Sequence, residues 1–508
     1  MYLSDRLQTP RASLDKAPSD RSTAFGVIDP LLCVLGGTFP DIQLLILNEW
    51  ANRSSGATRF LHARLLGLGR GISVMLRGWL CLASLVLITC LMAAADWPTF
   101  LGPSGNGISP EKGVPQPWPK QGLKKLWSCD LGWGYAPPVV FQGRLYHFDR
   151  FGDQARLTCR DARTGRYLWK FEYPTAYEDF YGYEPGPRAC PVVDEEHVYL
   201  HGVEGMVYCL NRVDGRLVWK LDTQKEYHFH QNFFGVASVP VVVDDLLIVP
   251  VGGSPKGRRP LDFRDVRPNG TALVALEKKT GKVRWCSGQE LASYTSPLVV
   301  TMHGQKVILY FARGGLLVVE PQQGKVLLHF PWRARIEESV NAANPVVIGS
   351  RVLLSECYGP GSVLIDIDTQ WKPQIVWSDA PKDRWDRSLA AHWCTPIYWN
   401  GYLYACSGRE TPEADLRCLD YNTGEVQWIR RRTGRCTLLL VDHHLLCLNE
   451  FGTLLVIKPN PQKYEEVARW EIPELEYPCW APPVLSDGIL YLRGKGRLVA
   501  LELIPSKK

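Results

Sequence analysis

Short apolar runs alternate with tight turns along the chain from about residue 123 onward. One recurring run opens with a proline and two apolar residues, as in Pro138-Val-Val, Pro240-Val-Val and Pro345-Val-Val. A turn such as Asn400-Gly401 follows, and then a strand-like stretch of alternating residues such as Tyr402–Cys406. Alternation with a period of two between glycine-containing turns predicts short β-strands rather than helices.

A second signature follows each of these runs and ends in an aromatic residue. Its clearest copy begins at Asp161, passes through Gly165 and ends at Trp169. The aspartate can cap a turn, and glycine can adopt the positive φ that the turn requires. Other copies contain Gly215 and Trp219, Gly281 and Trp285, and Gly424 and Trp428. The aromatic residues recur about 42 to 66 residues apart, which fits four short strands per blade of a β-propeller.

Counting the strands predicts how the ring closes. Eight outer strands end at Trp127, Trp169, Trp219, Trp285, Phe330, Trp377, Trp428 and Trp470. The first of them, Leu123–Trp127, has no three strands before it, and the last three strands, ending at Leu498–Leu503, have no outer strand after them. We therefore predict an all-β fold over 123–505, an eight-bladed β-propeller of four-stranded antiparallel blades closed by the N-terminal strand. Residues 96–122 are a lead-in.

The residues before the lead-in are typical of an export signal. An apolar stretch over 78–95 follows Arg77 and ends in small residues, which predicts a secretory signal peptide over 75–95, cleaved after Ala95. Because such a signal starts a chain, we expect 1–74 to be a non-native or disordered extension. The alternative is a retained signal anchor, although eighteen uncharged residues barely span a bilayer. The prediction is a periplasmic or extracellular protein, membrane-associated only if the anchor is kept.

The composition of the chain excludes several classes of protein. With 508 residues, 45% hydrophobic and 22% charged, the chain is neither disordered nor a multi-span membrane protein. A net charge of +6 without a basic tract gives no support for nucleic-acid binding. The 15 cysteines are too few for a disulfide scaffold, and several of them, including Cys159, Cys209 and Cys418, occupy one small buried position of the repeat.

The pattern Asp-Ala-x-Thr-Gly-x-x-x-Trp at Asp161–Trp169 resembles the pyrroloquinoline quinone (PQQ) repeat family, and the resemblance extends over roughly residues 120 to 505. That family contains quinoprotein dehydrogenases and assembly factors of the BamB type. The resemblance implies a propeller and, for a dehydrogenase, PQQ and Ca²⁺ as cofactors. Because the repeat residues dock blades rather than carry out chemistry, they indicate the fold better than the function.

The long connecting segments point to one face of the ring. In a four-stranded antiparallel blade, the loop between the second and third strands and the link to the next blade share a face, and all the long segments map there. These segments are Pro174–Pro187, Gln224–Gly235, Gly253–Gly270, Ala334–Asn341, Asp379–His392 and Ser407–Asp415. Several are rich in aromatic residues, which suit a glycan, a peptide or a planar cofactor, or simply pack the loops onto the rim.

Candidate site residues lie near the starts of the inner strands, at the expected mouth of the central channel. They are Arg188, Asn341, Asn344, His392, Trp393 and Trp480. His228 and His230 could share a face as metal ligands, but no third ligand lies at a recognisable spacing. The adjacent Cys-Cys pair of the quinoprotein dehydrogenases is absent from the sequence, as are the common hydrolase, zinc-protease and phosphate-loop motifs.

The sequence thus favours an exported, non-catalytic binding or scaffolding propeller. It would hold a protein partner, a small polar or aromatic ligand or a glycan on the long-loop face. The alternative is a divergent quinoprotein oxidoreductase that uses PQQ and Ca²⁺. A glycan-binding propeller is a third hypothesis.

Overall fold

The computed structural model describes residues 95–229, 233–255, 266–336 and 339–505. The expected N-terminal extension, residues 75–94 of the expected signal peptide, and His230 lie outside these ranges. None of the helices in the described part of the chain reaches the length and apolarity that a membrane span requires.

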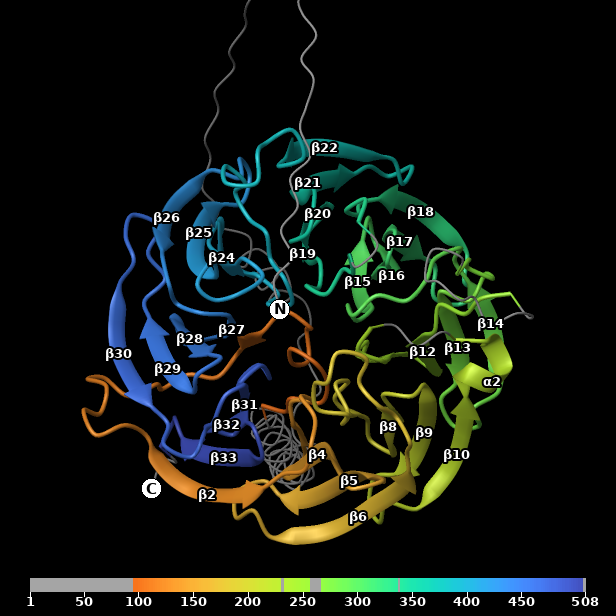
Figure 1. Ribbon diagram of the computed structural model, residues 1–508, viewed down its shortest axis with the longest axis horizontal. Coiled ribbons are helices and arrows are strands. Elements are labelled where there is room, and N and C mark those ends of the chain that lie inside the picture. Colours follow the sequence, from red (N-terminus) through yellow and green to blue (C-terminus); the bar gives the residue numbers. More distant parts are fainter. Residues whose placement is uncertain (1–94, 230–232, 256–265, 337–338, 506–508) are drawn as a thin grey trace, which may run out of the picture. The chain divides into compact units, whose positions relative to one another are not determined.

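The strands of the described residues form eight sheets arranged as a ring in chain order (Figure 1). Blade 1 consists of β3 (Val139–Phe141), β4 (Arg144–Phe151), β5 (Gln154–Asp161) and β6 (Tyr167–Pro174). Blade 2 consists of β7 (Val192–Val193), β8 (His197–His201), β9 (Met206–Asn211) and β10 (Leu217–Asp222). Blade 3 consists of β11 (Val241–Val243), β12 (Leu246–Pro250), β13 (Leu273–Glu277) and β14 (Val283–Ser287). Blade 4 consists of β15 (Leu298–Met302), β16 (Gln305–Phe311), β17 (Gly315–Val319) and β18 (Val326–Pro331).

The second half of the ring repeats this plan. Blade 5 consists of β19 (Val346–Ile348), β20 (Arg351–Glu356), β21 (Gly361–Ile367) and β22 (Pro373–Ser378). Blade 6 consists of β23 (Ile397–Trp399), β24 (Tyr402–Ser407), β25 (Asp415–Asp420) and β26 (Val426–Arg430). Blade 7 consists of β27 (Cys436–Val441), β28 (His444–Asn449), β29 (Thr453–Ile457) and β30 (Glu466–Glu471). Blade 8 consists of β31 (Val484–Ser486), β32 (Ile489–Gly494), β33 (Arg497–Glu502) and β2 (Lys124–Asp130).

The predicted closure of the ring is confirmed. Strand β2 pairs antiparallel with β33, with Trp127 opposite Ala500, so the N-terminal strand completes the blade formed by the C-terminal strands. One sheet contains more than the predicted four strands, because β1 (Ile108–Ser109) adds a parallel strand to the inner edge of β27. Part of the lead-in therefore belongs to a blade.

The turn glycines and outer-strand tryptophans of the repeat dock neighbouring blades onto each other. The indole N–H of Trp219 in blade 2 donates to the carbonyl of Lys278 in blade 3 at 3.0 Å. Gly281 in the same turn has a φ of +72°, and a Cβ there would lie 2.7 Å from the Trp219 ring. Glycine is thus required both by the backbone angle and by the ring that lies on it. The same contact joins Trp127 to Gly165, Trp169 to Gly215, Trp285 to Gly324 and Trp377 to Gly424.

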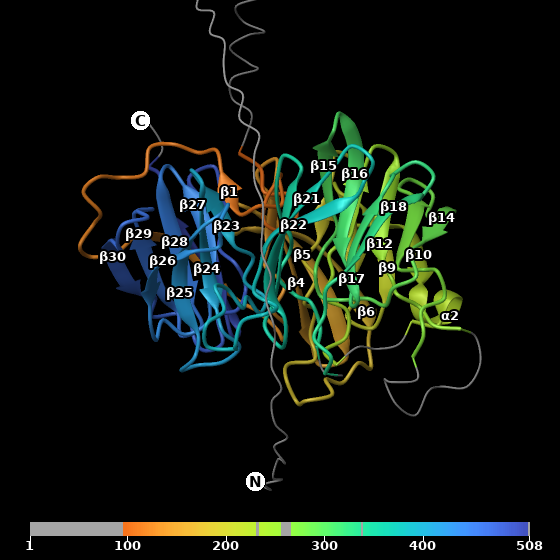
Figure 2. The same ribbon diagram turned by 90° about the horizontal axis from the view of Figure 1, so that it is seen from above.

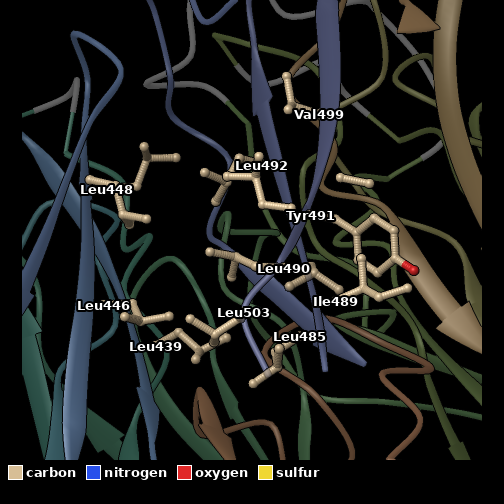
Figure 3. Packing of buried hydrophobic residues seen from close by; sticks show 14 of the residues in the cluster. Leu439, Leu446, Leu448, Leu485, Ile489, Leu490, Tyr491, Leu492, Val499 and Leu503 are labelled. Carbon is tan, nitrogen blue, oxygen red and sulfur yellow. The ribbon is translucent and has the colours of Figure 1, made fainter. Parts of the chain in front are cut away.

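The hydrophobic core lies between the faces of adjacent blades. Between blades 7 and 8, Leu446 and Leu448 pack with Leu485, Leu490 and Leu492, all fully buried (Figure 3). Burying a leucine stabilises the fold by about 1.5–3 kcal/mol, so each blade interface contributes substantially. The ring therefore forms a rigid support for the loops on its two faces.

The predicted long segments all connect strand ends on one face, here called the long-loop face, and the tight turns lie on the opposite, short-turn face. Seen edge-on, the segment after β6 extends from one side, while the orange lead-in runs along the other (Figure 2). The lead-in is held by short-turn residues. Gln142 N donates to Asp96 at 2.8 Å, Gly113 N to Asp442 at 2.9 Å, and Gly488 N to Glu111 at 2.6 Å.

Candidate functional site

A cavity of about 240 Å³, here called the funnel, opens at the centre of the long-loop face. Its walls come from the links between blades and the loops between second and third strands. Phe100 and Leu101 of the lead-in also line it, so a segment held on the short-turn face contributes to the funnel from within the ring.

One position of the repeat lines the funnel in every blade. It lies three residues before the proline that opens the inner strand, or before Leu438 in blade 7. Its occupants are Tyr135, Arg188, Ala237, Tyr294, Ala342, Trp393, Arg435 and Trp480. Aromatic and arginine side chains therefore occupy this position in blades 6, 7, 8, 1 and 2 and in blade 4, whereas alanines occupy it in blades 3 and 5.

Trp480 is the centre of an aromatic cluster in the funnel. Its ring centroid lies 4.9 Å from that of Tyr135, 5.4 Å from that of Trp393 and 5.7 Å from that of Tyr183. The planes are tilted or edge-on, which are the arrangements that aromatic quadrupoles favour. The cluster gives one side of the funnel a preformed aromatic wall.

Arg435 is fixed against this wall. Its guanidinium carbon lies 4.8 Å from the ring centroids of both Trp393 and Trp480. Its Nε donates to Glu450 Oε2 at 2.7 Å, and the Trp480 indole donates to the same oxygen at 3.3 Å. Glu450 is only 1% exposed. Burial opposes its ionisation, but hydrogen bonds from Arg435 and Thr411 outweigh burial and hold the Glu450 pKa below its usual value.

His392 lies beside Trp393 and is a neutral imidazole at physiological pH. Its Nε2 is 3.1 Å from the hydroxyl of Tyr358, and its ring centroid is 4.6 Å from that of Trp393. Burial, together with the charges of Arg409 and Arg435, lowers the His392 pKa to about 3. The ring therefore offers hydrogen bonds and a flat surface rather than a positive charge.

Arg188 also lines the funnel, and its polar groups hold the 174–187 loop. Its guanidinium donates to Asp179 Oδ2 at 2.5 Å and to the Gly186 carbonyl at 3.1 Å. The Asp179 carboxylate is fully buried. The structure thus brings Arg188, His392, Trp393 and Trp480 together around one cavity.

The structure places the two predicted asparagines outside the residues that line the funnel. Asn341 is 1% exposed and donates to the Ala312 carbonyl at 2.7 Å, so it joins a link to a neighbouring blade. Asn344 accepts from Ser296 N at 2.8 Å and borders a second cavity of about 230 Å³ between the lead-in and the inner strands of blades 2 to 4.

His228 follows the short helix α2 (Thr223–Tyr227) with a φ of 54° and caps its C-terminus. Its predicted partner His230 lies outside the described residues. Within the ranges that the structure describes, no three His, Cys, Asp or Glu side chains are grouped so as to hold a metal ion.

The polar groups of the funnel do not suit calcium. Ca²⁺ in proteins takes roughly six to eight oxygen ligands, several of them carboxylates. The charged residues in the funnel lining are Arg188, Arg409, Arg435 and one carboxylate, Glu410. Glu410 is itself 3.6 Å from Arg409. A cationic lining of this kind repels a divalent cation, so we derive no quinone-and-calcium reaction from this site.

Sequence reasoning missed several lining residues. Arg435, Tyr135 and Tyr294 occupy the same repeat position as Arg188, Trp393 and Trp480, so alignment of the eight units on the strand-opening proline identifies them. Phe100 and Leu101 carry no such signal, because the path of the lead-in depends on contacts with distant turns.

Comparison with known proteins places this architecture in a family. Residues 120–285 and 262–430 match the family described as outer membrane protein assembly factor BamB, and together these stretches cover more than half of the chain. The chain belongs to this family. Its PQQ-like propeller, expected from the sequence motif, is therefore confirmed.

Similar proteins include a solved structure of BamB and two alcohol dehydrogenases. The structure of BamB from Moraxella catarrhalis matches with a TM-score of 0.52 and 12% sequence identity. The match covers 76% of this chain and 99% of the BamB chain, and it shows a similar fold. Quinohemoprotein alcohol dehydrogenase ADH-IIG of Pseudomonas putida is 25% identical over 171 residues, 32% of this chain and 21% of the enzyme. Quinoprotein alcohol dehydrogenase PedH of the same species is 25% identical over 147 residues, which are 27% of this chain and 22% of the enzyme. The chain thus matches about a fifth of the length of these enzymes.

Proposed function

We propose that this BamB-type propeller is an exported, non-catalytic binding protein that holds a partner protein on its long-loop face. The main support for the proposal is the set of exposed aromatic side chains on the face into which the funnel opens. Those on the long-loop face are Trp133, Phe151, Phe180, Tyr181, Tyr183, Trp385, Phe451 and Tyr477. Exposed apolar patches beside a polar rim are typical of interaction sites, and aromatic residues are enriched in the buried centres of interfaces.

The internal pairing of the funnel's polar groups supports binding rather than catalysis. Arg188 pairs with Asp179 and Arg435 pairs with Glu450. His392 contacts Tyr358. Catalytic acids and bases need pKa values near the working pH, whereas the His392 pKa of about 3 removes it from that range. The funnel therefore presents shape and aromatic surface rather than a reactive group.

Site-specific photo-crosslinking in the producing organism tests the proposal. A photoreactive phenylalanine analogue replaces Tyr183, which is 43% exposed on the long-loop face, or Tyr167, which is 51% exposed on an outer strand. We expect a defined crosslinked partner from position 183 and none from position 167. Equal crosslinking from both positions, or none from position 183, contradicts the proposal.

A quinoprotein oxidoreductase is the second candidate, favoured by the sequence similarity to the two alcohol dehydrogenases. PQQ and Ca²⁺ added to the purified chain, followed by dye-linked oxidation of primary alcohols, separate the two candidates. The binding proposal predicts no turnover above the cofactors alone. Saturable PQQ binding with turnover establishes the enzyme instead. Binding on a carbohydrate array, without a protein crosslink, establishes the glycan-binding alternative.

A further inference from the structure

Three exposed arginines of the long-loop face, here called the basic edge, lie in segments of blades 6 and 7 that also contribute residues to the funnel lining. Arg409 lies in the loop between β24 and β25, and Arg431 and Arg432 lie in the link between β26 and β27. All three side chains are exposed, and Arg409 lines the funnel itself. The two segments are joined at their bases, because Thr411 and Arg435 both donate to the buried Glu450. The two segments therefore lie side by side, with Arg409 in the funnel lining and Arg431 and Arg432 in the link that leads to Arg435.

The charges of this edge are largely available to a partner. Arg409 has one carboxylate nearby, Glu410 at 3.6 Å, and both side chains are more than half exposed, so water screens their attraction. Arg431 and Arg432 take part in none of the ion pairs between described residues. Exposed arginines with free donors suit carboxylates, which they can bind through two parallel hydrogen bonds.

The funnel beside this edge is sized and lined for one aromatic ring. An apolar cavity of about 150 Å³ is enough to hold benzene. The funnel is larger, about 240 Å³, and is lined by aromatic rings including Trp393, Trp480 and Tyr358. A phenol or indole ring can therefore enter it and stack on walls that are already ordered.

The charge of the lining decides which aromatic ligand fits. An aromatic cage without its own cation attracts quaternary ammonium groups. Here Arg435 already lies against Trp393 and Trp480, Arg409 lies 4.9 Å above the ring of Tyr358, and His392 is neutral. A cationic ligand is repelled by these arginines, whereas a ring flanked by carboxylates is attracted.

We propose that the funnel and its basic edge bind an extended acidic segment of a partner protein, which inserts one aromatic side chain into the funnel. The flanking Asp or Glu side chains pair with Arg409, Arg431 and Arg432. This inference rests on the proposed binding function of the long-loop face and names the chemistry of its partner.

Labelled synthetic peptides test the inference by fluorescence anisotropy with the purified full chain. The parent peptide has a central tryptophan flanked by glutamates. Matched peptides replace the tryptophan by alanine, the glutamates by glutamine, or the glutamates by lysine. We expect saturable binding of the parent peptide that weakens with salt, at least about tenfold weaker binding of the alanine and glutamine peptides, and none of the lysine peptide.

Two charge-matched variants locate the binding. R409Q/R431Q/R432Q removes the basic edge, and R163Q/R216Q/R284Q removes three exposed arginines remote from the funnel. We expect the first variant to bind the parent peptide at least about tenfold more weakly and the second to bind it with unchanged affinity. Tyr183 lies beside Trp480, so Tyr183→Ala tests whether the aromatic ring inserts there. This substitution should weaken binding of the parent peptide but not of the alanine peptide.

Three outcomes overturn the inference. They are no saturable binding of the parent peptide, equal loss with both triple variants, and tighter binding of anionic glycans or phosphatidylglycerol vesicles than of the peptide. If photo-crosslinks from position 183 persist while the peptide fails, the binding function stands and only the acidic-aromatic specificity is wrong. If both fail, the proposed function fails as well.

Discussion

Substitution of Gly281 by alanine tests the contact that docks one blade onto the next. Gly281 has a φ of +72°, and the new Cβ would lie 2.7 Å from the Trp219 ring. The backbone angle alone costs an L-residue about 1–2 kcal/mol. Displacement of the ring also weakens the indole hydrogen bond to the Lys278 carbonyl, which contributes about 0.5–1.5 kcal/mol. We therefore expect Gly281→Ala to lower the free energy of unfolding by about 1.5–3.5 kcal/mol.

Gly304 provides the matched control for this substitution. It lies in a tight turn with a φ of +75°, and a Cβ added there meets no other atom within 4 Å. Gly304→Ala therefore has the backbone cost, about 1–2 kcal/mol, without the ring displacement. Urea unfolding followed by tryptophan fluorescence measures both variants against the parent chain. Equal destabilisation by Gly281→Ala and Gly304→Ala would refute the docking role of the glycine–tryptophan contact.

Substitutions in the lead-in and beside the funnel, and the first residue of the exported chain, provide further tests. Burial raises the pKa of Glu111 to about 7, so the ionised carboxylate destabilises the fold increasingly as pH rises from the unfolded pKa of about 4.5 through 7. Glu111→Gln should therefore raise the melting temperature at pH 8 and change it little at pH 4. An equal change in melting temperature at both pH values contradicts this role of Glu111. The Glu450 pKa is held below its usual value, so its stabilising pairing with Arg435 is present above the unfolded pKa and lost as pH falls through the folded pKa. Glu450→Gln should therefore lower the melting temperature at pH 7. It should also make the decrease of the melting temperature at acidic pH smaller than in the parent chain, which thermal scans at several pH values measure. Mass spectrometry of the exported protein should find a chain that begins at Asp96, and peptides from residues 1–74 in that product contradict the signal assignment.

The fold could be predicted from the sequence because its determinants are local and repeated. Each turn glycine and each outer-strand tryptophan occurs at a fixed place in its unit, so Gly165 with Trp169 already indicates the blade. The unpaired first strand, Leu123–Trp127, indicates the closure. The added strand β1 could not be predicted, because two residues pair with β27 only after the lead-in has been positioned by distant turns.

The funnel was only partly predictable for the same physical reason. Trp393 and Trp480 could be placed at the channel mouth because they share one repeat position. The pairing of Arg435 with Glu450, by contrast, depends on where two segments meet after folding. Asn341 looks like a ligand-binding amide in the sequence, but its side chain is used by the backbone carbonyls of the preceding blade.

Hydrogen–deuterium exchange of the chain in complex with its crosslinked partner locates the binding surface. We expect slower exchange in residues 174–187, 408–414 and 430–436 of the long-loop face, relative to the free chain. Exchange in the short-turn segment 162–166 should be unchanged. Protection confined to the short-turn face or to the outer strands, with the funnel segments unchanged, would contradict a binding site on the long-loop face.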